Sequence, residues 1–198
     1  MSQLIVQMQS SLDGFVDTSL EGVDWQQWDW GPECPWSTDL VEYFNKVIAD
    51  ASGLIVSRPL LEGGFLDHWH HMAEVKHGDP AYAFAARVTS LPKFLLTAKR
   101  PERTWPGTTA HVGDLAQGVA QAKDAAGGDL VCFGGAGLVK SLLRAALVDQ
   151  LQLFVNPAVA GRGTRIFDEE MVNREWHAID ATPHGCGVIV CHWRAIHG

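Results

Sequence analysis

The chain has 198 residues, a formal net charge of −8, 46% hydrophobic residues and 19% charged residues. This length fits one α/β domain over residues 1–198, and the composition is that of an ordinary globular protein. No stretch approaches the ~18 consecutive apolar residues of a membrane span, and the negative charge disfavours nucleic acid and anionic membranes as partners. The opening run at residues 4–8 lacks the basic start and cleavage site of a secretory signal, so we expect a cytoplasmic location.

The residue types that bind metals form no recognised pattern. The sequence has four cysteines, Cys34, Cys132, Cys186 and Cys191. They show no CxxC pairing and two lie in strongly apolar runs, which favours buried thiols over disulfides or metal ligands. Residues 67–71 include three histidines, but the adjacent His70 and His71 point to different faces of a helix. A partly exposed helix is therefore favoured over a zinc site, and we predict no metal.

Apolar patterning predicts a parallel β-sheet with helical crossovers. Three short runs are apolar throughout and bounded by turn residues: residues 53–56, 93–96 and 130–133. Such runs are typical of strands buried on both faces. Apolar residues recur at three- and four-residue spacing over 40–51 and 138–147, which predicts helices, and a third helix is expected from Asp114 to Gly127. This alternation is typical of βαβ units.

The C-terminal part has a different pattern. Residues 151–155, 175–181 and 188–195 are strand-like, and residues 182–185 form a suitable hairpin connection between the last two. The sheet is therefore predicted to be mainly parallel, with antiparallel C-terminal strands.

The first predicted helix has a recognisable start. Ser37 can cap it, Asp39 lies in the first turn where the helix dipole favours an acid, and Trp36 can pack on Val41. Before it, residues 13–35 form a long loop rich in Trp, Asp and Gly, which is either a lid or an ordered surface excursion.

Three predicted strand ends carry residues suited to a dinucleotide. Phe133-Gly134-Gly135-Ala136-Gly137-Leu138-Val139 opens a helix, where free N–H groups and the helix dipole attract phosphate. The spacing is not a full GxGxxG, and a glycine-rich turn can also arise from packing alone. Ser57-Arg58-Pro59-Leu60 and Thr97-Ala98-Lys99-Arg100 follow the other two strands. Because open α/β sheets bind ligands beyond the carboxyl ends of their strands, these segments predict a cradle, although Lys99 and Arg100 could equally be a solvated pair.

The order of motifs along the chain resembles the dihydrofolate-reductase-like superfamily. Ser11-Leu12-Asp13-Gly14-Phe15 follows the first strand, Ser57-Arg58 the second, and Gly134-Gly135 precedes a helix. The segments at 147–151, 156–157, 161–163 and 166–167 complete the order. The chain is most similar to the branch that contains the C-terminal reductase domain of riboflavin biosynthesis proteins. The resemblance spans nearly the whole chain and implies a three-layer α/β fold with NADPH laid across the strand ends.

The resemblance also implies which residues bind the cofactor. Ser57, Arg58, Pro59 and Leu60 would meet its phosphates, Thr97, Ala98 and Lys99 would flank the 2′-phosphate, and Gly134, Gly135, Ala136, Gly137 and Leu138 would cover the pyrophosphate. The first of these motifs usually reads Gly-Arg-x-Thr in the family. Here Pro59 and Leu60 remove a backbone N–H and a hydroxyl from the expected phosphate site.

On the substrate side, the resemblance implies a catalytic role for Asp13 beside the nicotinamide, with Phe15, Asp39 and Phe44 as substrate-binding residues. Asp13 could instead be a turn-forming residue before Gly14, and Asp39 could be a first-turn acid that serves only the helix dipole. Trp25, Trp28 or Trp30 would shield the pocket, or alternatively cover the surface or a dimer contact.

We therefore expect an NADPH-dependent reductase that transfers hydride to a small heterocyclic or imine-like substrate, either pterin-like or ribosylaminopyrimidine-like. The deaminase zinc signature is not seen, which disfavours the riboflavin-pathway reaction itself. The alternatives are a nucleotide-binding protein with little or no turnover and a structural dimer subunit. By analogy with related reductases, residues 151–159 are expected to help form a homodimer.

Overall fold

The computed structural model describes residues 2–18, 20–21, 25–27, 34–172 and 174–196. Its strands in chain order are β1 (Leu4–Ser10), β2 (Gly53–Val56), β3 (Lys93–Thr97), β4 (Thr108–Val112), β5 (Leu130–Cys132), β6 (Gln150–Val155), β7 (Trp176–Pro183) and β8 (Ile189–Ala195). The helices are α1 (Thr38–Ala49), α2 (Arg58–Glu62), α3 (Phe65–Val75), α4 (Ala83–Ser90), α5 (Leu115–Ala126) and α6 (Ala136–Arg144), with 3-10 turns η1 (Pro80–Tyr82) and η2 (Glu169–Met171). Within the described residues, no helix is both long and apolar enough to cross a bilayer.

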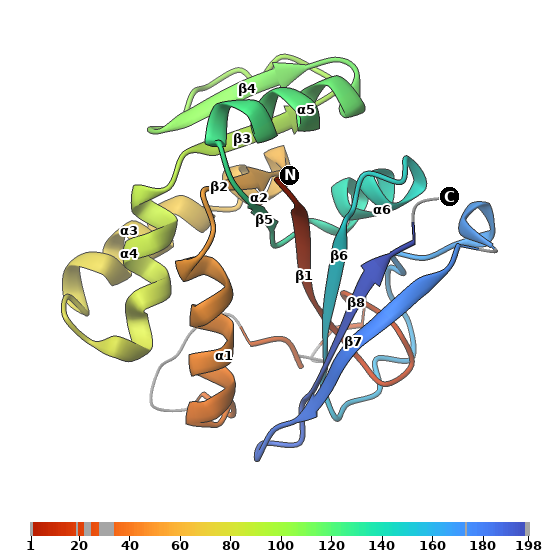
Figure 1. Ribbon diagram of the computed structural model, residues 1–198. Helices are drawn as coiled ribbons and strands as arrows, with labels where there is room; N and C mark the ends of the chain where they lie inside the picture. The colour runs from red at the N-terminus through yellow and green to blue at the C-terminus, as the bar shows by residue number, and fades with distance from the viewer. Residues whose placement is uncertain (1, 19, 22–24, 28–33, 173, 197–198) are drawn as a thin grey trace.

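The strands form one sheet in the order β4-β3-β2-β5-β1-β6-β8-β7 (Figure 1). From β4 to β6 every neighbouring pair is parallel, whereas β8 runs antiparallel to β6 and to β7. In the middle of the sheet, Val6 of β1 pairs with Cys132 on one side and with Leu151 on the other. The mainly parallel sheet with antiparallel C-terminal strands is thus confirmed.

Helices cover both faces of this sheet and create two cores, so the fold has three layers. On one face, α1 buries Leu40 and Ile48 against α3, α4 and the strands. On the other face, α5 buries Val119 and α6 buries Leu142. The helices carry these residues at three- and four-residue spacing because one side of each helix must face the sheet.

The predicted helix boundaries are largely confirmed. The Asp114 carboxylate caps α5 by accepting a bond from the Gln117 N–H at 2.8 Å, and Gly127, with φ +67°, ends the helix. Ser37 occupies the N-cap position of α1, but its hydroxyl makes no capping bond. Trp36 lies in the same apolar cluster as Val41 and stacks on Phe154 with ring centroids 5.6 Å apart.

One C-terminal expectation needs correction. Strand β7 continues to Pro183, and the turn is closed by the His184 N–H, which donates to the Val188 carbonyl at 2.9 Å. The hairpin connection therefore lies later than residues 182–185. Strand β6 lies inside the sheet with Leu151 and Phe154 buried, whereas Val159, beyond the strand, is exposed. The role of residues 151–159 in a homodimer stays a prediction.

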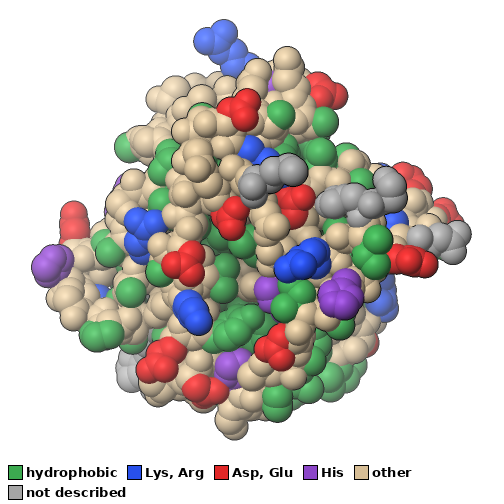
Figure 2. Space-filling view, viewed as in Figure 1, with side chains coloured by type: hydrophobic (Ala, Val, Ile, Leu, Met, Phe, Trp, Pro, Cys, Tyr) green, Lys and Arg blue, Asp and Glu red, His purple; other side chains and the backbone are tan. Residues whose placement is uncertain are grey.

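No disulfide joins the four cysteines, all of which lie in the described part of the chain; Cys132 is fully buried, while the other three are only partly buried. Burial raises the pKa of the Cys132 thiol to about 12, which makes it a poor nucleophile. On the face shown in Figure 2, Lys and Arg side chains are scattered among acidic ones rather than gathered into one patch.

Candidate functional site

A groove lies at the carboxyl ends of strands β2 and β3 and beside the start of α6. We call it the polar groove; its volume is about 530 Å³, and it is lined by Ser57, Arg58, Pro59, Leu96, Thr97, Ala98, Lys99, His111, Gly113, Leu115, Gly137, Leu138 and Ser141. It brings together residues from all three segments predicted to hold a dinucleotide. This is the edge of an open α/β sheet at which ligands bind.

The polar groove carries positive charge at its outer end. Lys99 and Arg100 are exposed, and no ion pair to either is found among the described residues. The Thr97 hydroxyl donates to the Lys99 carbonyl at 2.9 Å, which fixes the turn that holds Lys99. Arg58 forms an exposed ion pair with Glu62 at 3.7 Å, a contact of little energetic weight. Lys99 and Arg58 are thus available to a phosphate group.

Ser57 connects the two loops that border the groove. Its hydroxyl oxygen accepts a hydrogen bond from the Gly135 N–H at 3.0 Å and another from the Leu60 N–H at 3.3 Å. The side chain is buried, with 5% of the residue exposed. One hydroxyl therefore holds the start of α2 and the glycine loop before α6 at a fixed separation.

The glycine loop leaves room for a ligand. A Cβ at Gly137 would meet no atom within 4 Å, so the groove is open at the first turn of α6. Gly134 has φ +114°, a conformation that favours glycine, and its hydrogen faces Met8 of β1. The N–H groups and dipole at the start of α6 thus face open space, as phosphate binding requires.

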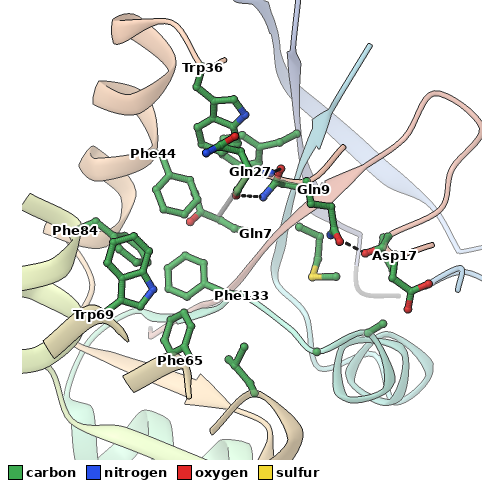
Figure 3. A pocket seen from close by; sticks show the side chains of 17 residues that line it. Gln7, Gln9, Asp17, Gln27, Trp36, Phe44, Phe65, Trp69, Phe84 and Phe133 are labelled. Atoms are coloured by element: carbon green, nitrogen blue, oxygen red, sulfur yellow. Dashed lines mark hydrogen bonds between the residues drawn. The ribbon is translucent and has the colours of Figure 1, made fainter. Parts of the chain in front are cut away.

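A second cavity of about 240 Å³, the aromatic pocket, is shown in Figure 3. It lies next to the polar groove along the chain: Leu60, Gly135 and Ala136 line the pocket, and the adjacent residues Pro59, Gly137 and Leu138 line the groove. Seven aromatic side chains line it: Trp36, Phe44, Phe65, Trp69, Phe84, Phe133 and Phe154. Many of these rings contact each other, such as Trp69 and Phe84 with centroids 4.6 Å apart. They come from α1 and the residue before its cap, from α3 and α4, and from the carboxyl ends of β5 and β6, so the pocket depends on the whole fold.

Four glutamines supply most of the polar lining of the aromatic pocket. Gln9 of β1 holds Gln27 by two bonds: its Nε2 donates to the Gln27 carbonyl at 2.6 Å, and its Oε1 accepts from the Gln27 N–H at 2.8 Å. The Gln26 side chain donates to the Val16 carbonyl at 2.9 Å. Gln7 donates to the Gln152 side chain at 2.8 Å, while its buried Oε1 has no hydrogen-bond partner among the described residues.

Asp17 is the charged side chain of the aromatic pocket. One carboxylate oxygen accepts a bond from the Thr164 N–H at 2.6 Å, which fixes the side chain. The neighbouring backbone approaches so closely that a Cβ at Gly163 would lie 2.0 Å from the Asp17 carbonyl oxygen. The sequence pattern points to Asp13 and does not single out Asp17, although both acids follow the first strand.

Asp13 is not among the residues that line the pocket. Its carboxylate accepts hydrogen bonds from the Ser11 hydroxyl at 2.6 Å and from the N–H groups of Ala160 and Gly161 at 3.0 and 2.8 Å. The Ser11 bond, followed by these backbone bonds, lowers the pKa of Asp13 to about 2. A carboxyl group so firmly ionised is a poor general acid, so the structure favours a structural role, the tying of two loops.

Of the three predicted substrate-binding residues, the structure brings only Phe44 to the pocket. The Asp39 carboxylate points elsewhere and lies 2.5 Å from Nδ1 of the buried His184 in the β7–β8 turn. The Ser37 hydroxyl and then His184 lower the pKa of Asp39. Phe15 lies under the Arg165 guanidinium, 4.1 Å from its ring centroid. Asp39 therefore joins α1 to the β7–β8 hairpin and is not among the residues that line the aromatic pocket.

The loop at 13–35 borders the pocket through Val16, Asp17, Gln26 and Gln27. Trp25 is not part of the lining, and Trp28 and Trp30 lie outside the described residues. The predicted helix at 67–71 is confirmed as part of α3, and Trp69 from this cluster enters the pocket wall.

Residues 2–190 match the model of a protein family described as the RibD C-terminal domain. No curated protein matches the sequence significantly. Among solved structures, a protein of Shewanella sp. PV-4 assigned to riboflavin biosynthesis is 19% identical with a TM-score of 0.69, covering 98% of this chain and 99% of its own. Dihydrofolate reductase from Enterococcus faecalis, solved with NADP(H), is 15% identical with a TM-score of 0.56, covering 98% and 97%.

A diaminohydroxyphosphoribosylaminopyrimidine deaminase/5-amino-6-(5-phosphoribosylamino)uracil reductase from Thermotoga maritima is 12% identical with a TM-score of 0.60. It covers 98% of this chain, which corresponds to 57% of that protein. These distant similarities confirm the dihydrofolate-reductase-like fold, and the family match extends over most of the sequence. The chain belongs to the family of RibD C-terminal domains.

Proposed function

We propose that the protein is an NADPH-dependent reductase that binds its cofactor in the polar groove and reduces a small heterocyclic or imine-like substrate in the aromatic pocket. The observation that carries this proposal is that the same two segments, residues 59–60 and 135–138, contribute lining residues to both cavities. An extended dinucleotide can place its phosphates in the first cavity and its reactive ring at the mouth of the second. Family membership and the fold of the NADP(H)-bound neighbour support the same arrangement.

The residues of the polar groove fit NADPH. Lys99 and Arg100 suit a 2′-phosphate, because charge-assisted hydrogen bonds to phosphate are stronger than neutral ones. The start of α6, with open space at Gly137, suits the pyrophosphate. When bound, NADPH supplies the hydride from C4 of its nicotinamide ring.

The chain's own contribution is to position the reactants and to exclude water. The aromatic side chains stack on a flat acceptor and shield it, and Ser57 holds the two loops between which the cofactor passes. Asp17, rather than Asp13, is the carboxyl group that we assign to proton delivery, directly or through a water molecule. One of its oxygens is held by Thr164, which leaves the other for this role.

One observation favours a second candidate, a nucleotide-binding protein with little turnover. Pro59 has no N–H, and the Leu60 N–H already donates to Ser57, so the start of α2 offers few donors to a phosphate. Steady-state NADPH oxidation with pterins, pyrimidines and quinones, beside calorimetric NADPH binding, separates the two. A reductase binds NADPH and oxidises it with at least one acceptor; binding without oxidation favours the second candidate, and no binding contradicts both.

A further inference from the structure

We infer that the substrate is a small, flat, uncharged heterocycle that carries an N–H donor and no phosphate. This inference rests on the proposed function and defines the substrate class of the same pocket. It differs from the phosphorylated substrate named for the Thermotoga maritima fold neighbour.

The lining of the aromatic pocket argues against an anion. Among the described residues that line it there is no Lys, Arg or His, and the charged one is the acid Asp17. A phosphate group needs paired cations or clustered N–H donors, and a carboxylate nearby repels it. A phosphorylated substrate would therefore lose affinity here.

The sequence extends this argument to the residues around the pocket. Residues 1–45 contain no Lys, Arg or His, and residues 11–39 contain seven Asp and Glu residues. The loop at 13–35 therefore cannot bring a cation to the pocket whatever its conformation. The nearby Arg165 stacks on Phe15 and is not part of the lining.

The size and surface of the pocket point to a flat ring. A volume of about 240 Å³ lies below the range typical of drug-sized ligands, so the pocket suits one or two fused rings. Figure 3 shows Trp69, Phe84, Phe133 and Phe44 arranged around the cavity. Aromatic side chains offer stacking faces to such a ring.

Gln7 identifies the hydrogen bond that the substrate makes. Only 2% of this residue is exposed, and its Nε2 is engaged by Gln152. Gln7 is one of the residues that line the pocket, and its buried Oε1 has no hydrogen-bond partner among the described residues; a buried acceptor in this state is unfavourable. A ring N–H donated to Oε1 removes this penalty, whereas a ligand without a donor does not.

Two matched pairs of ligands test the inference: 5-amino-6-ribosylaminouracil with its 5′-phosphate, and neopterin with its 3′-monophosphate. Each dissociation constant is measured by quenching of tryptophan fluorescence, with and without NADPH. We expect the neutral member of at least one pair to bind about 10-fold more tightly than its phosphate. Tighter binding of a phosphorylated member, or no binding of either neutral member, overturns the inference.

Two variants test the assigned residues. Asp17→Asn keeps an acceptor for Thr164 but removes the negative charge. The dissociation constants of the neutral and the phosphorylated ligand should therefore become more similar in this variant. Gln7→Met should weaken the neutral ligand about 10-fold, whereas Gln152→Met, which leaves Gln7 Oε1 in place, should not. An unchanged ratio of the two dissociation constants in Asp17→Asn contradicts the role of Asp17. An equal loss of affinity for the neutral ligand in Gln7→Met and Gln152→Met contradicts the role of Gln7.

Because these titrations measure binding, they are independent of turnover. If the neutral ligands bind as expected but no NADPH is oxidised, the proposed reductase function fails while the inference about the pocket holds. If NADPH oxidation occurs with phosphorylated substrates that bind more tightly, the inference alone fails.

Discussion

The hydroxyl of Ser57 accepts a hydrogen bond from the backbone N–H of Gly135 at 3.0 Å, across 78 positions of sequence. This bond joins the carboxyl end of β2 to the loop that follows β5, and both segments contribute lining residues to the two cavities. Neither loop is long, and both lie at the ends of buried parallel strands. The bond therefore fixes the separation of two segments that line both the polar groove and the aromatic pocket.

Replacing Ser57 tests this role. Ser57→Ala loses the N-cap of α2 and leaves the Gly135 N–H without its acceptor, so we expect a loss of about 1 kcal/mol in the free energy of unfolding and weaker NADPH binding. Ser57→Thr keeps the hydroxyl and should retain most of both properties. Denaturant unfolding and calorimetry measure them; a Ser57→Ala variant with wild-type NADPH affinity would show that the bond does not shape the groove.

Cofactor choice depends on Lys99 and Arg100. The double variant Lys99→Ala/Arg100→Ala should weaken NADPH binding by about 10- to 100-fold, because hydrogen bonds to charged groups contribute about 1.5–3 kcal/mol. NADH binding should change little. Lys46→Ala, at an exposed position on α1, serves as the control for a lost surface charge. Equal dissociation constants for NADPH and NADH in the wild type would refute this prediction.

A substitution at Gly137 should affect stability and NADPH binding in opposite directions. Gly137→Ala adds a methyl group where no atom lies within 4 Å, and alanine favours the helix by about 0.5–1 kcal/mol. The variant should therefore be at least as stable as the wild type yet bind NADPH less tightly, because the methyl group enters the ligand's space. Thermal unfolding and calorimetry provide the two readings. Undiminished NADPH affinity would place the pyrophosphate elsewhere.

The pKa of Asp13 predicts a pH dependence of stability. The pKa of Asp13 is about 2 in the folded protein, below the 3.8 of an unperturbed Asp side chain. Its contribution to the free energy of unfolding is therefore complete above pH 4 and is lost as the pH falls toward 2. Asp13→Asn should be less stable than the wild type at pH 7, and this difference should shrink between pH 4 and pH 2. Asp124→Asn, at an exposed position of α5, is the control. A difference that stays constant down to pH 2 contradicts the prediction.

The same two loop acids can be compared in catalysis. Once a substrate is identified, Asp17→Asn should reduce kcat by roughly the 10²–10⁴-fold typical of losing a general acid. Asp13→Asn should preserve kcat in the folded fraction, because its carboxylate ties Ala160 and Gly161 rather than facing the pocket. The reverse pattern would return the catalytic role to Asp13.

Much of the fold could be predicted because its signals are local. Strand β2 has the predicted bounds, and α5 begins after Asp114 and ends at Gly127 as its capping residues indicate. Strand β4 was not predicted, because an edge strand of Thr, Ala, His and Val with mostly exposed side chains has no apolar run to reveal it. Helix α4 was missed as well, since its eight residues fall between other elements without a clear start.

The cofactor side of the site was easier to predict than the substrate side. Residues at the ends of parallel strands must gather at one edge of the sheet, so Ser57, Thr97 and Gly137 could be placed together from the sequence. The aromatic pocket depends on how α1, α3 and α4 pack, which no local pattern reveals. Gln7 lies in the middle of a strand, and Asp17 differs from Asp13 only by the path of a loop.

The most direct test of the central claim is a crystal structure of the protein grown with saturating NADPH. The account predicts density for the adenosine 2′-phosphate beside Lys99, for the pyrophosphate at Gly135 to Gly137, and for the nicotinamide at the mouth of the aromatic pocket. Density for the adenosine end inside the aromatic pocket, or a polar groove without cofactor density at saturation, would contradict it.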